Sequence, residues 1–104
     1  MMERRLNNRL TIRLPSRLEA TIPSGEKKVY DLETKDLSID GAFIYTNEFL
    51  SFPEGTRFII DIIFPSDSNR ELTKLKSLME CIGTMVRSNS EGIAIHFDSE
   101  CDII

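Results

Sequence analysis

Apolar and polar side chains alternate along much of this chain with a period of two, which is typical of β-strands that bury one face. The pattern is clear near the start, where Leu10, Ile12 and Leu14 alternate with polar residues. Pro15 cannot donate to a sheet ladder, so we expect a bend or bulge at that position. Strands are predicted over residues 10–14, 18–22, 29–32, 41–45, 58–64, 76–88 and 92–97.

Turn-forming residues separate these segments. Residues 23–25 (Pro-Ser-Gly) and 53–55 (Pro-Glu-Gly) are predicted turns, and residues 65–69 a loop. Six or seven short strands with regular turns are typical of a sandwich or a barrel, and a barrel is favoured because it removes sheet edges. Residues 70–75 fit a helical turn or a strand extension, and Gly83 predicts a bulge or a close backbone approach.

Length and composition predict a single domain. The chain has 104 residues, 40% of them hydrophobic, and no apolar run reaches the ~18 residues of a membrane span. The basic N-terminus has no apolar stretch after it, so no secretory leader is expected. We therefore predict that Cys81 and Cys101 are reduced thiols in a cytoplasmic protein.

Charge is distributed unevenly along the chain. Residues 1–18 hold five Arg and one Glu, a net +4, whereas residues 19–104 hold eight Lys and Arg against sixteen Asp and Glu, a net −8. An acidic body does not suit general nucleic-acid binding, so DNA is not an expected partner and RNA is disfavoured. The distribution indicates either a local anion site or a basic arm that folds back on its own acidic body.

Residue types for catalysis are poorly represented. Asp36 and Asp40 lie four residues apart, but no substrate-stabilising partner accompanies them. His96, the single histidine, alternates outward from its strand neighbours, which predicts a solvated side chain. There is no phosphate-binding glycine loop and no Cys/His spacing of a metal site. We expect neither an enzyme nor a cofactor.

Three arginines precede the first predicted strand. Arg4, Arg5 and Arg9 lie on residues 1–9, which lack periodicity and are predicted to form a mobile arm. A planar guanidinium can grip two phosphate oxygens, and it can also pair with O6 and N7 of guanine. Such an arm could therefore clasp a small ligand that offers both phosphate and guanine.

The stretch DLSIDGAFI offers complementary groups. Asp36 can accept hydrogen bonds from guanine N1 and N2, Ser38 can bond a phosphate or a base edge, and Gly41 leaves space for close backbone approach. In the alternative interpretation, Asp36 and Ser38 only cap their own turn.

Together these two stretches resemble the signature of the PilZ domain family, the bacterial receptors for cyclic di-GMP. The signature's R-x-x-x-R corresponds to Arg5-LNN-Arg9, and its [D/N]-x-S-x-x-G to residues 36–41. Residues 81–87 (CIGTMVR) and 92–97 (GIAIHF) are similar to two later strands of the family, and Arg4 matches its frequent double-arginine form.

The resemblance implies an all-β fold, a six-stranded antiparallel β-barrel of the split-barrel type. Residues 1–9 would be the flexible arm across one barrel opening, 10–98 the barrel and 99–104 a short tail. Arg5 and Arg9 would grip guanine and phosphate. Leu37, Ile39, Phe43 and Ile44 are predicted packing residues, and Asp40 has no assigned role.

Within the resemblance, Asp36 and Ser38 would contact a guanine from the barrel surface, Gly41 would permit the turn, and Arg4 would add a phosphate contact. The function implied is a cyclic di-GMP receptor that switches a partner when its arm becomes ordered. The sequence does not name that partner, which could belong to motility, polysaccharide or transcription machinery. The alternative is a ligand-independent interaction module whose arginines contact its own acidic body.

Overall fold

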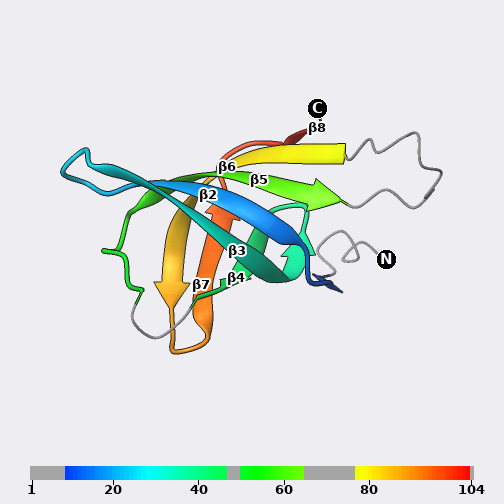
Figure 1. Ribbon diagram of the computed structural model, residues 1–104, viewed down its shortest axis with the longest axis horizontal. Helices are drawn as coiled ribbons and strands as arrows, with labels where there is room; N and C mark the ends of the chain where they lie inside the picture. The colour runs from blue at the N-terminus through cyan, green and yellow to red at the C-terminus, as the bar shows by residue number, and fades with distance from the viewer. Residues whose placement is uncertain (1–8, 47–49, 65–76, 104) are drawn as a thin grey trace, which may run out of the picture.

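Every regular element that the computed structural model describes is a β-strand (Figure 1). The structure describes residues 9–46, 50–64 and 77–103. The strands are β1 (Leu10–Thr11), β2 (Pro15–Thr21), β3 (Lys27–Ser38), β4 (Gly41–Tyr45), β5 (Arg57–Phe64), β6 (Ser77–Ser88), β7 (Gly92–Phe97) and β8 (Asp102–Ile103).

Six of these strands close a barrel in which all neighbours are antiparallel. The order runs β3, β2, β5, β6, β7 and β4, and β4 pairs with β3 to complete the ring. The short β1 adds to β3, and β8 adds to β6. The prediction of a six-stranded antiparallel barrel is therefore confirmed.

The barrel interior is filled by the alternating apolar positions of its strands. Leu18, Ile60 and Ile44 are fully buried, which confirms the inward faces expected from the sequence pattern. Three aromatic rings add to the packing, and Phe52 lies edge-on against both Tyr30 and Phe58. The remaining core residues are Leu14, Ala20, Leu37, Ala42, Ile62, Cys81, Met85, Ile93, Ile95 and Phe97.

The first predicted strand is interrupted between Thr11 and Pro15. Residues 12–14 leave the sheet ladder because the buried Thr34 takes over their hydrogen bonds. The Thr34 hydroxyl donates to the Ile12 carbonyl at 2.6 Å and accepts from the Leu14 amide at 2.9 Å. The Thr34 amide also donates to the Leu14 carbonyl. Pro15 begins β2 rather than marking a bulge.

β3 is far longer than the predicted strand over 29–32, and it contains a bulge. The register against β4 shifts between Thr34 and Asp36, which leaves Lys35 as the extra residue. An extra residue reverses the inside–outside alternation of a strand. Before the bulge Leu32 and Thr34 face inward, and after it Leu37 does.

Cys81 and Cys101 form a disulfide, so the prediction of reduced thiols is wrong for this structure. The pairing of β8 with β6 places Ile103 opposite Met79, and continuing that register sets Cys101 opposite Cys81. Their Cα atoms are 4.4 Å apart, within the range that a disulfide spans. The argument for a cytoplasmic location that rested on reduced thiols no longer holds.

Several local predictions are confirmed. Gly25 and Gly55 adopt positive φ in the predicted turns, and His96 is exposed on β7. A Cβ on Gly83 would lie 2.6 Å from the His96 carbonyl oxygen, so this glycine is a point of close approach. The predictions for residues 65–76 lie outside the described residues. None of the described segments forms a helix able to cross a membrane.

The disulfide is expected to stabilise the fold, and this contribution can be measured. Cys101→Ser should lower the free energy of unfolding by about 3 kcal/mol, because the bond closes a loop with a sequence separation of 20 in the unfolded chain. The measurement is thermal unfolding without reductant. Ser99→Ala, an exposed change in the same tail, should leave the midpoint nearly unchanged. Two titratable thiols in unreduced, denatured wild type would contradict the disulfide.

Candidate functional site

The β3–β4 hairpin carries three of the predicted site residues. Asp36 and Ser38 are the last outward-facing residues of β3, and Gly41 is the first residue of β4. The turn itself consists only of Ile39 and Asp40. Asp36 therefore lies in a strand and not in the turn, which differs from the sequence interpretation.

The bulge at Lys35 sets the direction of the Asp36 side chain. Without an extra residue, Asp36 would share the inward face of Leu32 and Thr34, where an unpaired carboxylate is strongly disfavoured. With it, Asp36 lies opposite Phe43 on the outer face, and its side chain is 18% exposed. The carboxylate is thus half-buried but accessible from outside the barrel.

The arm and the hairpin meet at this carboxylate. Arg9 Nη1 donates to Asp36 Oδ1 at 2.8 Å, and the Arg9 side chain remains 53% exposed. β1 supports the contact, because Thr11 pairs with Asp36 along the backbone. The structure therefore brings together one residue from each predicted half of the site. Arg4 and Arg5 lie outside the described residues.

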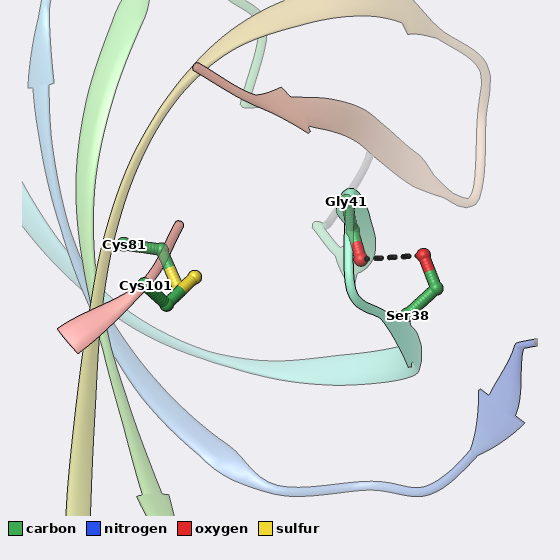
Figure 2. Close-up of a disulfide and its surroundings, with 4 residues drawn as sticks. All are labelled: Ser38, Gly41, Cys81 and Cys101. Atoms are coloured by element: carbon green, nitrogen blue, oxygen red, sulfur yellow. Dashed lines mark hydrogen bonds between the residues drawn. A yellow bond between two sulfur atoms is a disulfide. The ribbon is translucent and has the colours of Figure 1, made fainter. Parts of the chain in front are cut away.

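Ser38 bonds within its own turn. Its hydroxyl lies 2.8 Å from Asp40 Oδ1 and 3.3 Å from the Gly41 carbonyl oxygen, which are alternative acceptors for one proton. Figure 2 shows the bond to Gly41. This is the capping role that the sequence left open as an alternative. Asp40, which had no predicted role, holds the hydroxyl, and its own carbonyl accepts from the Phe97 amide at 2.8 Å.

Gly41 is required by strand packing. A Cβ at this position would lie 2.5 Å from the Ile95 carbonyl oxygen of β7. Its φ is not positive, unlike that of Gly25 or Gly55. The prediction that Gly41 permits the turn is therefore corrected: the glycine allows β4 to approach β7.

Two cations beside the hairpin were not identified from the sequence. Lys35 Nζ donates to Glu91 at 2.9 Å and lies 5.3 Å from the centre of the Phe43 ring. The hydrogen bond to Glu91 raises the pKa of Lys35. The available signal was the break in alternation after Thr34, which places Lys35 at the bulge.

Arg13 is the second of these cations. Its Nε donates to Glu33 Oε1 at 2.7 Å, and its guanidinium lies 4.6 Å from the centre of the Tyr45 ring. Hydrogen bonding and charge attraction by Glu33 raise the pKa of Arg13. Arg13 therefore stays protonated throughout the physiological range.

A hollow of about 330 Å³ lies beside the turn. Its lining includes Ser38, Ile39, Met79 and Cys101, so the disulfide borders the same opening as the hairpin (Figure 2). Ile39 is 68% exposed, which corrects its assignment as a packing residue. Its exposed side chain gives the opening an apolar rim.

The other three predicted packing residues, Leu37, Phe43 and Ile44, are buried. Phe43 is separate from the main core and lies on the outer side of β4 near Lys35. Of these residues, Phe43 is the one that lies opposite Asp36 on the outer face of the barrel.

Comparison with known families agrees with this geometry. The family model described as PilZ domain matches residues 3–103, essentially the whole chain. The chain belongs to the PilZ family. No curated protein matches the sequence significantly. PilZ domains are in general receptors for cyclic di-GMP and serve as binding modules rather than enzymes. Among the described residues, no group of His, Cys, Asp and Glu side chains forms a metal site.

The packing role of Gly41 can be tested without any ligand. Gly41→Ala should lower the free energy of unfolding by about 3 kcal/mol, because the new Cβ overlaps the backbone of β7. Chemical denaturation measures this change. In Gly25→Ala the Cβ meets nothing within 4 Å, so only its positive φ should cost about 1 kcal/mol. A Gly41→Ala protein as stable as wild type would refute the steric explanation.

Proposed function

We propose that this PilZ domain is a receptor for cyclic di-GMP. The observation that supports the proposal most directly is the Arg9–Asp36 contact of 2.8 Å, because it joins the two family motifs at one point of the barrel surface. The ligand offers two guanines and two phosphates. Arginine fits phosphate oxygens and the guanine O6/N7 edge, whereas a carboxylate fits the guanine N1/N2 edge.

The roles of the site residues follow from their chemistry. Arg5 and Arg9 bind guanine and phosphate, and Arg4 adds a phosphate contact. Asp36 accepts from guanine N1 and N2 through the carboxylate that Arg9 releases when it turns to the ligand. Ser38 turns its hydroxyl from Asp40 toward the ligand. Gly41 contributes through the strand spacing that fixes this hairpin.

Binding has to replace an existing ion pair. Arg9 and Asp36 already satisfy each other, so the ligand gains only what its bonds add beyond that exposed pair. Charge-assisted hydrogen bonds contribute about 1.5–3 kcal/mol each. Four or five of them outweigh an ordering cost of about 2–5 kcal/mol. We therefore expect micromolar or tighter affinity.

Calorimetric titration with cyclic di-GMP tests this function. Arg9→Ala and Asp36→Asn should each weaken binding about 10- to 100-fold, because each removes one charge-assisted interaction. Arg17→Ala is the matched control: Arg17 is also an exposed arginine paired with an aspartate, Asp31, but it lies on β2 away from the hairpin. Absence of binding heat with wild type would refute the proposal.

The receptor acts as a switch when the arm closes over the ligand. Residues 1–9 then form a new surface, with the bound nucleotide, for a downstream protein in motility, polysaccharide or transcription machinery. We expect amide exchange of residues 1–11 to slow on addition of cyclic di-GMP, since backbone groups that contact the ligand lose solvent.

The control for this exchange experiment is the Arg9→Ala variant at ligand saturation. Exchange in the β5–β6 pair should be unchanged in both proteins. Slow exchange of the arm already in ligand-free wild type would contradict the switch while leaving ligand binding intact.

A ligand-independent interaction module is the second candidate, and the same ion pair favours it. Arg9 bonded to Asp36 fits an arm that lies on the barrel without a nucleotide. This candidate predicts no calorimetric signal and an arm protected from exchange at all times. The two experiments together separate the candidates.

A further inference from the structure

An apolar row crosses the outside of the barrel, away from the β3–β4 hairpin. Val29 of β3, Ile59 of β5 and Ile82 of β6 are all exposed, and the strand registers place them in one row across the sheet, with Ile59 directly opposite Ile82. Glu19 of β2 stands between Val29 and Ile59. The β2, β3, β5 and β6 strands run next to one another in this part of the barrel (Figure 1).

Charged residues flank this row, with opposite signs on its two sides. One side carries Lys27 of β3 and Arg57 of β5, which lie on either side of Thr21 of β2. The other side is mainly acidic, and its residues in register are Asp31, Arg17, Asp61, Glu80 and Asp102. The face is therefore striped, with a basic row, an apolar row and an acidic row.

Such a striped face is complementary to itself. A two-fold axis that runs along the apolar row turns the face over and exchanges the basic and acidic rows. Val29, Ile59 and Ile82 then each meet their own copies, Glu19 also meets its own copy, and each basic row meets an acidic row. The strands of the two sheets also remain aligned, which is a common way for sheets to pack face to face. A two-fold axis along the strands would instead place like charges together.

We propose that this face is the interface of a homodimer. Across the axis, Arg57 of one copy faces Asp61 of the other, and the two-fold symmetry forms the same pair a second time. Arg57 donates to the exposed Asp98 at 3.1 Å, an ion pair on the surface that can exchange partners at little cost.

This face also has two hollows that side chains of a second copy can fill. Two hollows of about 290 and 250 Å³ lie on this face, and Ile59 borders both of them. Ile82 lines the first, and Val29 lines the second. Side chains from the opposing face can enter these hollows, which increases the area buried beyond that of two flat sheets.

The interface is small, so the dimer is weak. Three exposed apolar side chains place it at the low end of specific interfaces, and we expect a dissociation constant of about 100 µM. Because its charged rows are exposed at their edges, raising the salt concentration should weaken it. The proposal does not depend on nucleotide binding, and the test uses the ligand-free full chain.

Sedimentation velocity over a range of protein concentrations tests the interface. Wild type should pass from monomer to dimer as concentration rises through about 100 µM. Ile82→Lys should weaken dimerisation at least 10-fold, because a charge replaces an apolar contact. Val86→Lys is the matched control: it is on the same strand, is 54% exposed against 43% for Ile82, and lies off the row.

Charge exchange tests the orientation of the two-fold axis. Arg57→Glu alone should abolish dimerisation by setting like charges together, and adding Asp61→Arg should restore it. Restoration also shows that the single variant had not failed through misfolding. Glu19→Gln should strengthen the dimer, since the axis brings Glu19 beside its own copy.

Each contrary outcome has a definite meaning. A wild type that stays monomeric at ~500 µM would overturn the proposal. So would an Ile82→Lys variant that dimerises as well as Val86→Lys. A double charge variant that remains monomeric, or a Glu19→Gln dimer no stronger than wild type, would overturn the proposed orientation.

Discussion

Closure of the barrel depends on β3, whose two edges bond different strands along its length. One edge bonds β2 along residues 27–33 and the short β1 at residues 36–37, and the other edge bonds β4 along residues 33–38, so the strand must bend within its twelve residues to close the sheet. A sheet that closes needs strand bending of this kind, and an extra residue supplies it. The bulge at Lys35 meets that need. The same residue that allows closure also decides which side chains of the hairpin face outward.

The geometry of the candidate site therefore follows from the way in which the barrel closes. Asp36 faces outward because the bulge precedes it, and Gly41 is a glycine because β7 lies directly behind β4. Ser38 and Asp40 hold the turn between them. Much of the signature thus supports the fold, and one carboxylate on the surface receives an arginine. A motif can be diagnostic of function while most of its members support the backbone.

The sequence was sufficient for the barrel and for five of its six strands in outline, because residues 92–97 alternate clearly and residues 58–64 are nearly all β-branched or aromatic. It was insufficient where tertiary pairing decides the outcome. The length of β3 and its bulge depend on having β2 and β4 as partners. The disulfide depends on β8 docking against β6, which a tail of acidic residues does not suggest. Ile39 was misassigned because an apolar residue at a turn tip follows no period.

Thr34 fixes the point at which the N-terminal segment is attached to the barrel. Its three hydrogen bonds hold Ile12 and Leu14 against the barrel core, so the segment before Ile12 has a fixed anchor. Arg9 is only three residues from that anchor, a tether of at most about 10 Å. Over so short a tether the local concentration of its guanidinium around Asp36 is high, in the millimolar range or above. Any group that approached Asp36 from outside would have to compete with this tethered guanidinium, and the length of the tether would partly set how well it competes.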